Sequence, residues 1–439
     1  MEKFYDEGMY EGMKKKVLAF AAAAVLMAPQ MVGAEGFAIY EWSAEGLAMG
    51  GARMFAENDA ANLAFNPASI TKVKGEAFKV SATYLSPHGK YYAKGGKIDP
   101  TVTGGIRPVA ESGHNRIHPA WAPGMYYVKQ MNDKEWFGMG TYSRFGMVSQ
   151  FERDSMAGTN AFSSKLNGVS LAANYARKLD KKWTASLGAE VNYVGLQLDK
   201  NAYGVSPLHV EGESYALGWN AAANYTFDDK NEMGLVYRSK INHSMEADYD
   251  MHNSKSLAAV MAMKGLAVDP TKVPNSIYGD AYGFVTLPES IDLGYSHKFN
   301  DKTRVEARYT WTRWERYAAL DMDFSSFPGP QPSYKGWSNG QRFALGLEHK
   351  FSNKYTGMIG YAHDKSSIPY DGGDFMIPTG TRTTYSIGAQ YHDKKQTLAV
   401  ALGWMNVGSL DFAGGGLIAN AHTRDSYTKI ASISYQRNF

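Results

Sequence analysis

The sequence predicts an all-β protein: a fourteen-stranded antiparallel transmembrane β-barrel with a small N-terminal hatch, or plug, in its lumen. Three observations carry this prediction. Apolar and polar residues alternate by twos from about residue 76 onward, short turns alternate with long loops, and aromatic residues gather near the ends of the alternating segments. This combination is typical of a barrel that crosses an outer membrane, because each of its strands has one lipid-facing and one lumen-facing side.

The alternation is strict in several segments. Within residues 290–299, Ile291 and Leu293 share one face of an extended chain and Asp292 lies on the other. A period of two is that of a strand with one apolar and one polar face. The same period recurs in residues 303–311, 342–351 and 433–439.

The connections between these segments are of two kinds. The short ones are rich in Asp, Asn and Lys and lie near residues 131, 179, 228, 300, 351 and 392. The longer, irregular ones lie at about residues 87–118, 146–162, 199–213, 248–284, 317–336, 365–382 and 407–426. Short turns interleaved with long loops in these numbers give fourteen strands that run up and down, as in outer-membrane barrels.

Segment length and aromatic placement favour a membrane barrel over a soluble sandwich. Residues 183–200, 213–228 and 231–249 exceed the usual length of a globular strand. Tyr225 and Tyr309 lie toward the ends of apolar faces, where an aromatic ring with a polar tip suits a membrane interface. The alternative is a secreted all-β protein with an aromatic core, but the polar faces carry too many charges for a second buried sheet.

The first 34 residues match a signal peptide. Lysines at residues 14–16 precede an apolar run at residues 17–28, and the residues up to Ala34 fit the pattern that a signal peptidase reads. We expect cleavage after Ala34 and export of the chain. Residues 1–12 are unusually acidic for such a leader, so they are either spurious, with Met13 as the true start, or an extension.

Residues 35–75 form the predicted hatch, and residues 76–439 form the predicted barrel. A barrel of this width has a lumen that side chains alone do not fill, so a plug is needed. A helix is expected to begin near Asn58 and to end before Pro67, which lacks a backbone donor and disfavours helical geometry in the preceding residue. Asn66 could then cap the turn, although spacing alone is explained more simply by a plain helix end.

Composition excludes several classes of protein. The chain has no Cys, so it is not a disulfide scaffold, and its net charge of +3 gives no reason to expect a nucleic-acid partner. No cofactor and no metal site are expected, because His114 and His118 lie in a Gly- and Pro-containing loop and the paired aspartates at residues 321–323 and 371–374 fit solvated turns. Nothing in the spacing of Ser, His and Asp marks a catalytic set, so no enzyme is expected.

Four pieces of the chain resemble the FadL family of outer-membrane transporters for long-chain fatty acids and other hydrophobic compounds. Residues 43–70 are similar to the family's N-terminal hatch, including its Asn-Pro-Ala motif at Asn66, Pro67 and Ala68. The other three pieces follow in the order of the family's strands, and the likeness covers essentially the whole mature chain. They are residues 138–151, 287–317 and 358–391.

The resemblance implies that a ligand is captured at an apolar surface among the outer loops, moves to an inner pocket, and leaves sideways where the third strand is kinked. It places the kink at Ser143, Arg144, Phe145 and Gly146. It places capture beside a short apolar helix expected within residues 254–268, at Leu257, Val260, Met261, Met263 and Leu266. Methionine suits varied apolar ligands because it is flexible and polarizable, but packing of this helix against neighbouring loops is the alternative.

An inner pocket for an amphipathic acid needs apolar walls and one or two cations for the carboxylate. The cations that face the lumen by strand parity are the candidates, and they are Arg238, Lys240, Arg304 and Arg308. Asp292 and Glu306 share these faces, so a purely structural ladder of charges is the alternative for each cation.

The expected function is uptake of hydrophobic molecules across the bacterial outer membrane, with long-chain fatty acids as the first expectation and aromatic hydrocarbons as the alternative. A general porin and an outer-membrane lipid enzyme are the alternatives from other classes. The expected partners are the hydrophobic ligand, outer-membrane lipid, and the barrel assembly machinery, which would engage the C-terminal Phe439.

Overall fold

The computed structural model describes residues 36–95, 111–263, 265, 267–317, 319–326, 331–413 and 418–439. The expected signal peptide and Leu266 of the expected capture helix lie outside the described residues.

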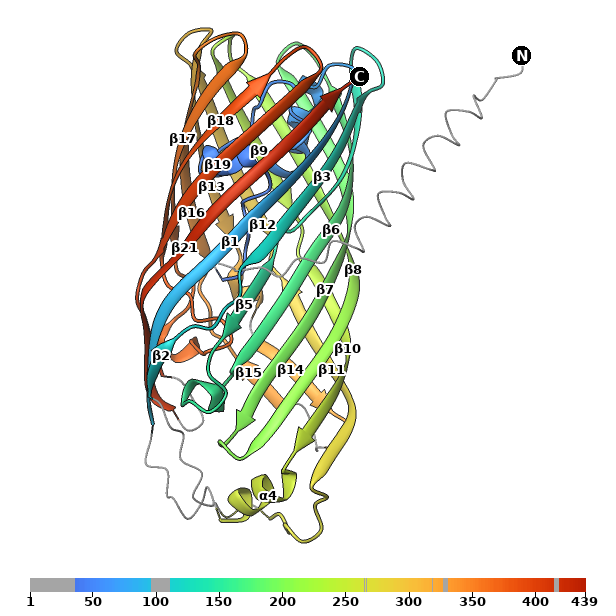
Figure 1. Ribbon diagram of the computed structural model, residues 1–439. Helices are drawn as coiled ribbons and strands as arrows, with labels where there is room; N and C mark the ends of the chain where they lie inside the picture. The colour runs from blue at the N-terminus through green and yellow to red at the C-terminus, as the bar shows by residue number, and fades with distance from the viewer. Residues whose placement is uncertain are drawn as a thin grey trace, which may run out of the picture.

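Antiparallel strands form a closed, fourteen-stranded barrel, as predicted (Figure 1). We call each of its fourteen wall positions a stave, whether it consists of one continuous strand or of two strands in line. The first strand closes the barrel by pairing with the last, from Ala77 opposite Asn438 to Gly95 opposite Ile418. The uninterrupted staves are β1 (Glu76–Gly95), β6 (Ser163–Lys178), β7 (Trp183–Ala202), β8 (Ser206–Thr226), β17 (Tyr355–Lys365), β18 (Arg382–His392) and β21 (Ile418–Asn438).

Each of the other staves is divided into two strands. In chain order these strands are β2 (Ser112–His114), β3 (Ala120–Gln130), β4 (Glu135–Tyr142), β5 (Gly146–Gln150), β9 (Asn231–Arg238), β10 (Ile241–His252), β11 (Ser276–Leu287), β12 (Ser290–Lys298), β13 (Thr303–Thr312), β14 (Ala319–Phe324), β15 (Gln331–Tyr334), β16 (Gly340–Lys350), β19 (Gln396–Val407) and β20 (Leu410–Phe412).

All six predicted short turns connect neighbouring staves, near the end of the barrel that also holds the C-terminus (Figure 1). One predicted long loop is wrong. Residues 199–213 are a strand hairpin, because β7 and β8 pair until Ala202 meets Ser206. The turn between them needs positive φ angles, which Tyr203 and Gly204 adopt at 52° and 73°.

A bulge between β9 and β10 reverses the parity of one stave. Arg238 pairs with Asn220 of β8, whereas Glu246 pairs with Glu213, so eight steps along one strand face seven along the other. The extra residue moves the next side chains to the opposite face. Lys240 is therefore exposed while Arg238 is buried, and the prediction that Lys240 faces the lumen is wrong.

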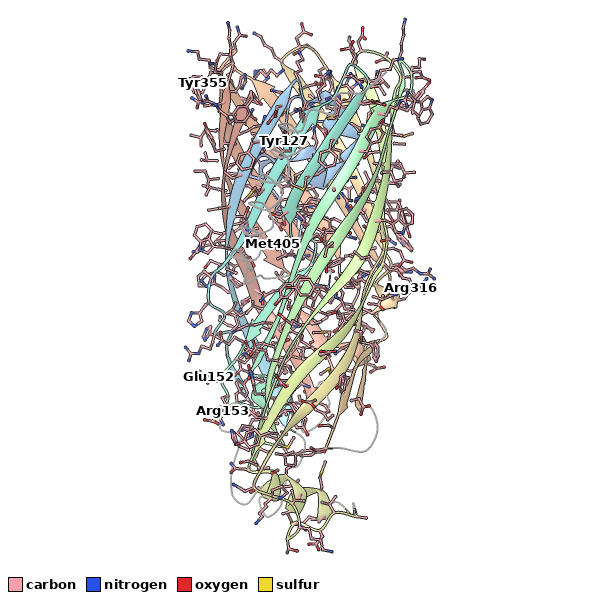
Figure 2. The ribbon with its side chains drawn as sticks, turned by 90° about the vertical axis from the view of Figure 1, so that its right-hand side faces the viewer. Tyr127, Glu152, Arg153, Arg316, Tyr355 and Met405 are labelled. Atoms are coloured by element: carbon pink, nitrogen blue, oxygen red, sulfur yellow. The ribbon has the colours of Figure 1, made fainter. Side chains whose placement is uncertain are left out.

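The outer face of the barrel is strongly apolar. Large aliphatic and aromatic side chains on alternate strand positions are more than half exposed, among them Leu187, Leu217, Phe284, Ile387 and Leu402. A protein surrounded by water rarely exposes so much apolar surface, and lipid is the solvent that suits it. Figure 2 shows the outward side chains along the barrel, with Tyr127 and Tyr355 toward the short turns and Glu152 and Arg153 toward the other end.

No helix in the described part of the chain is both long enough and apolar enough to cross a membrane.

Residues 36–75, which we call the hatch, fold inside the barrel near the short-turn end (Figure 1). They form α2 (Ala44–Ala48), α3 (Asn62–Phe65) and the 3₁₀ helix η1 (Pro67–Lys72). The helix before Pro67 begins at Asn62 and not near Asn58, whose positive φ of 51° ends helical geometry there. Outside the hatch, the helices are η2 (Ala157–Thr159), α4 (Ser254–Met263), η3 (Trp314–Arg316) and η4 (Tyr370–Gly372).

Candidate functional site

Buried charges of the barrel wall hold the hatch by its backbone. Glu306 Oε2 accepts hydrogen bonds from the backbone N–H groups of Met54 at 2.6 Å and Phe55 at 3.1 Å. Arg304 Nη1 donates to the Phe55 carbonyl at 2.6 Å. These bonds satisfy backbone groups that have no strand or helix partner, so the wall replaces secondary structure for this part of the hatch.

The other two arginines that were predicted to face the lumen also donate hydrogen bonds to backbone carbonyls of the hatch. Arg308 Nη1 donates to the Gly51 carbonyl at 3.0 Å, and Arg238 Nη2 donates to the Phe65 carbonyl at 3.3 Å. Both arginines also bond the buried carboxylate of Asp292, at 2.8 Å and 2.5 Å. Arg238, Arg304 and Arg308 therefore lie in the lumen as expected, and the structural-ladder alternative accounts for these bonds.

Within the hatch, Arg53 and Asp59 continue the same network. Arg53 bonds Asp59 at 3.2 Å and Glu348 of β16 at 2.6 Å. Asp59 also accepts from Lys79 of β1 at 2.8 Å. Burial alone would raise the pKa of the Asp59 carboxyl, but Lys79 and Arg53 outweigh burial and lower this pKa to about 2.

The Asn-Pro-Ala motif joins the hatch to β8. Asn66 Oδ1 accepts from the Ala68 N–H at 3.2 Å and so caps η1, whose first residue is Pro67. Asn66 Nδ2 donates to Asn224 Oδ1 at 2.7 Å, and Asn224 donates in turn to Ser69 at 2.9 Å. The motif is thus a buried cap that is hydrogen-bonded to the wall, which is more than a plain helix end.

The third stave is interrupted where the kink was predicted. β4 ends at Tyr142 and β5 begins at Gly146, and four steps between these residues face only three on β6. The first described residues of the hatch fill the break. Ala38 forms an antiparallel bridge with Phe145, flanked by a bond from the Ile39 N–H to the Arg144 carbonyl at 2.9 Å.

Further bonds tie the kink to its surroundings. Trp42 Nε1 donates to the carbonyl of Ser143 at 2.6 Å. The Arg144 side chain bonds the buried Glu190 of β7 at 2.5 Å. The kink is therefore held from the hatch on one side and from a neighbouring stave on the other.

An aromatic cluster that parity did not predict surrounds the start of the hatch. Phe37 packs edge-on against Phe145, Trp314 and Tyr317, with ring centroids 4.8–5.8 Å apart, and Trp337 joins the cluster. Trp314 lies in η3 and Trp337 outside any strand, so no alternation marks them. The sequence composition could have indicated this cluster, because large aromatic residues in outer-loop segments need an apolar partner.

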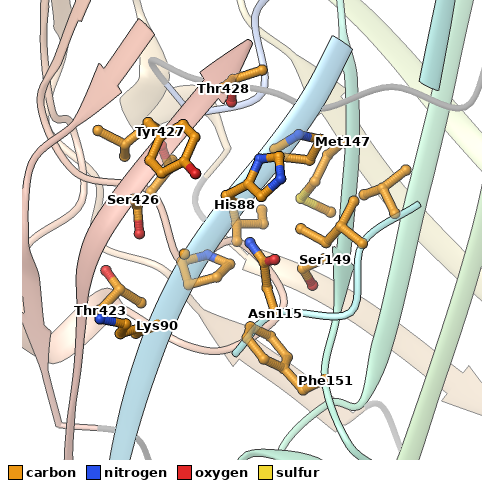
Figure 3. A pocket seen from close by; sticks show the side chains of 18 residues that line it. His88, Lys90, Asn115, Met147, Ser149, Phe151, Thr423, Ser426, Tyr427 and Thr428 are labelled. Carbon is orange, nitrogen blue, oxygen red and sulfur yellow. The ribbon is translucent and has the colours of Figure 1, made fainter. Parts of the chain in front are cut away.

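The wall has a gap beside the kink. β1 pairs with β3 as far as Leu85 opposite Ala120 and with β2 again from Lys90 opposite His114. Among the described residues β5 pairs with β6 and not with β1, and the backbone N–H groups of Asn115 and Arg116 donate to the carbonyls of Gly89 and Gln150 between them. A cavity of about 80 Å³ lies there, lined by residues of β1, β5, β19 and β21 and of the connecting segments at residues 115–117, 151 and 377–379 (Figure 3). Its lining combines the exposed His88 with the buried Phe151 and Thr423, so it is lined from both faces of the wall.

A second cavity, of about 20 Å³, lies between the kink and the hatch. Its lining holds three guanidinium groups, those of Arg144, Arg238 and Arg308, together with Trp42 and Phe145. Cations beside aromatic and aliphatic walls are what the head group of an amphipathic acid requires. Lys240 does not line this cavity.

The predicted capture helix is α4, at the end of the barrel opposite the short turns (Figure 1). Leu257 and Val260 are buried and pack into the core, and Met261 is partly buried against it. Met263 is 54% exposed. The packing alternative thus explains Leu257 and Val260 but not the exposed Met263.

A family model described as "Outer membrane protein transport protein (OMPP1/FadL/TodX)" matches residues 25–413. The chain belongs to this family. Its FadL/TodX membership makes it an outer-membrane barrel that transports hydrophobic compounds and is not an enzyme.

Curated relatives cover most of the chain. It is 25% identical over 430 residues to the long-chain fatty acid transport protein of Escherichia coli O6:H1, with 90% of this chain and 92% of that protein covered. It is 26% identical over 421 residues to outer membrane protein P1 of Haemophilus influenzae, with 86% and 87% covered.

Solved structures share the fold. A Pseudomonas aeruginosa FadL homologue gives a TM-score of 0.79 at 19% identity, covering 92% of this chain and all of that one. The Pseudomonas putida toluene transporter TodX gives 0.66 at 16% identity, covering 91% and 99%.

Proposed function

We propose that this FadL/TodX-family barrel takes up long-chain fatty acids and releases them sideways through the wall beside the kink. The observation that carries the proposal is the interrupted third stave, at which the hatch bridges Phe145 and next to which β1 and β5 are not paired with each other in the described part of the chain. The name of the Escherichia coli relative supports a fatty acid as the ligand.

The route has three stations. Ligand meets the exposed side of α4 at Met263, enters the lumen, and places its carboxylate near the cavity lined by Arg144, Arg238 and Arg308. It then passes the kink into the gap beside β1 and β5. Each station combines apolar surface with few, specifically placed polar groups, as ligand sites do.

The structure corresponds to a closed state of this route. The two cavities beside the kink, of about 20 and 80 Å³, are far smaller than the roughly 300 Å³ of a small ligand pocket. Passage therefore requires the start of the hatch to separate from the kink. Their bridge of few hydrogen bonds is the contact that would open.

Uptake of labelled oleate tests this proposal, in cells that lack their own fatty acid transporter. The wild-type chain should restore uptake, and Ile117→Trp should lower it several-fold because Ile117 lines the gap in the wall. Leu179→Trp, in an exposed short turn, is the matched control. Wild-type uptake in a folded Ile117→Trp variant would contradict sideways exit.

Aromatic hydrocarbon uptake is the second candidate. The cluster of Phe37, Phe145, Trp314 and Trp337 favours it, since aromatic rings pack well against flat apolar ligands. Labelled toluene in the same cells separates the two candidates. Toluene uptake without oleate uptake would replace the fatty acid as ligand.

We also propose that the barrel assembly machinery recognises Phe439 and that lipid covers the apolar outer face. Phe439 is 72% exposed at the edge where β21 meets β1, and its N–H donates to the Glu76 carbonyl at 2.8 Å. An exposed aromatic terminus with a satisfied backbone is free to be recognised. Deleting Phe439 should lower the amount of assembled barrel, measured by its heat-dependent gel mobility.

A further inference from the structure

The outward face of β19 and β21 changes in character along the barrel. Leu402 of β19 lies opposite Ala431 of β21, and both are apolar. The next outward pair, in the direction away from the short turns, is Trp404 with Lys429. The short turns of an outer-membrane barrel lie on the periplasmic side, so Trp404 and Lys429 lie toward the outer leaflet.

Three aromatic rings form a row at this level of the barrel. Tyr427 of β21 stacks on Trp404 with ring centroids 4.6 Å apart and on His88 of β1 with centroids 4.9 Å apart. Figure 3 shows His88 and Tyr427 next to one another on their two strands. Rings with a polar atom suit the level where hydrocarbon meets lipid head groups. The row therefore marks the outer edge of the apolar band.

Exposed cations lie at this edge and just beyond it. Lys429 Nζ lies 6.0 Å from the centre of the Trp404 ring. Further from the short turns, Arg424 of β21 lies opposite Lys90 of β1. We call Lys90, Arg424 and Lys429, which are all exposed, the cationic patch.

Two carboxylates lie near the cationic patch. Asp425 bonds Lys90 at 2.9 Å and so neutralises this lysine. Asp411 of β20 lies further from the apolar band, opposite His422. The other two cations of the patch form no salt bridge within the part of the chain that the structure describes. Their charge is therefore available to a partner outside the protein.

The opposite side of the barrel carries the reverse charge (Figure 1). Tyr215 lies as many residues from the end of β8 at Thr226 as Tyr427 lies from the end of β21 at Asn438. Carboxylates line an open outward groove beyond Tyr215. They are Glu211, Asp248, Asp250 and Asp280. An anionic head group is repelled from this side and attracted to the cationic patch.

The outer leaflet offers a partner with the matching chemistry. Bacterial outer membranes have glycolipids in this leaflet, with phosphates on their sugar head groups. Arginine binds phosphate through two donors of its planar fork, and lysine binds it as a point charge. A lipid whose acyl chains cover Leu402 and Ile433 would bring its phosphate to Lys429 and Arg424.

We propose that the cationic patch binds the phosphate of an outer-leaflet glycolipid, with Arg424 and Lys429 as its free cations. His88, Lys90 and Tyr427 also line the cavity at the gap in the wall, so this lipid would lie beside the gap. The inference goes beyond the proposed function and does not depend on which ligand the barrel carries.

Native mass spectrometry of the folded full chain tests the inference. The probes are bisphosphorylated lipid A and dephosphorylated lipid A, with EDTA present to remove divalent cations. The wild type should bind the phosphorylated probe more tightly than the dephosphorylated one. Arg424→Gln combined with Lys429→Gln should weaken binding of the phosphorylated probe roughly 10- to 30-fold, as expected for two cations near an anionic lipid. It should leave binding of the dephosphorylated probe unchanged.

The matched control is Lys181→Gln combined with Lys182→Gln, which removes two exposed cations at the short-turn end. Lys182 Nζ lies 5.8 Å from the centre of the Tyr225 ring, much as Lys429 Nζ lies 5.9 Å from that of Tyr427. The control therefore also loses a cation beside an aromatic ring. It should bind both probes as the wild type does.

Three results would each overturn the inference. The first is equal binding of phosphorylated lipid A by the wild type and the Arg424→Gln, Lys429→Gln variant, and the second is an equal loss in the short-turn control. The third is wild-type binding that occurs only without EDTA, which would assign the phosphate to the acidic groove through a bridging divalent cation. Heat-dependent gel mobility confirms that each variant is a folded barrel.

Discussion

The two halves of the lumen have different inner surfaces. In the half near the short turns, wall charges bond the hatch: Glu306 accepts two of its N–H groups, and Arg304 and Arg308 donate to its carbonyls. In the outer half, the inner wall of β7, β8 and β10 is apolar at Leu198, Leu208 and Met251.

The difference separates a half of the lumen that is held closed by buried ion pairs from a half with an apolar wall. Buried charges that are ion-paired and hydrogen-bonded fix one arrangement and are costly to break. An apolar wall gains stability when apolar surface covers it. The hatch and the outer half of the lumen can therefore be changed by separate substitutions.

The largest effect is expected from Glu306→Ala. It leaves the N–H groups of Met54 and Phe55 without their acceptor and removes one of the two carboxylates that pair with Arg304, the other being Glu348. Breaking a buried ion pair of this kind costs about 3–5 kcal/mol. The hatch should loosen, and planar-bilayer recordings should show ion conductance that the wild type lacks. Glu213→Ala, on the outward face, should leave the barrel sealed.

Low pH should also loosen the hatch, because it protonates Asp59 in the same half of the lumen. The pKa of this carboxyl is about 2 in the docked hatch, below its ordinary value near 3.8. The ionised Asp59 carboxylate therefore stabilises the docked hatch fully above about pH 4. This stabilisation, about 2 kcal/mol, is lost as the pH falls through about 2. Conductance measured against pH should rise below pH 4, and Asp59→Asn should remove this step while conducting more at neutral pH.

A smaller effect is expected from Asn66→Ala. It removes the cap of η1 and the bond to Asn224, which together contribute about 1–2 kcal/mol. The hatch should become more accessible to added protease, while the barrel itself keeps its heat-resistant mobility. Unchanged protection of the hatch would show that the motif is a plain turn.

The outer half should respond least. Met263→Asp places a charge on the exposed side of α4 and should reduce oleate uptake about two- to threefold, in line with the loss of one apolar contact of about 0.5 kcal/mol. Ser256→Asp, exposed on the same helix, adds the same single negative charge and is the control. Equal reductions in both variants would assign the effect to charge and not to capture.

The barrel was predictable because one rule, the period of two, repeats along nearly every stave. The rule placed Arg238, Arg304 and Arg308 in the lumen correctly. It failed at Lys240 because a single bulged residue reverses parity without any mark in the composition. The start of the hatch helix was misplaced because Asn58 adopts a positive φ that Asn tolerates but does not require.

The candidate site was less predictable because its parts meet only in three dimensions. The bridge from Ala38 to Phe145 and the aromatic cluster at Phe37 join residues that are far apart in sequence and lie outside regular strands.

The most direct test of sideways exit is to lock the hatch to the kink. The chain has no Cys, so Ala38→Cys with Phe145→Cys introduces a single possible disulfide, across a bridge whose geometry suits one. Oleate uptake should fall to background in oxidised cells and recover on reduction, while a control pair at Lys178 and Thr184 should transport in both states. Undiminished uptake with the Ala38–Phe145 pair fully oxidised would contradict the account.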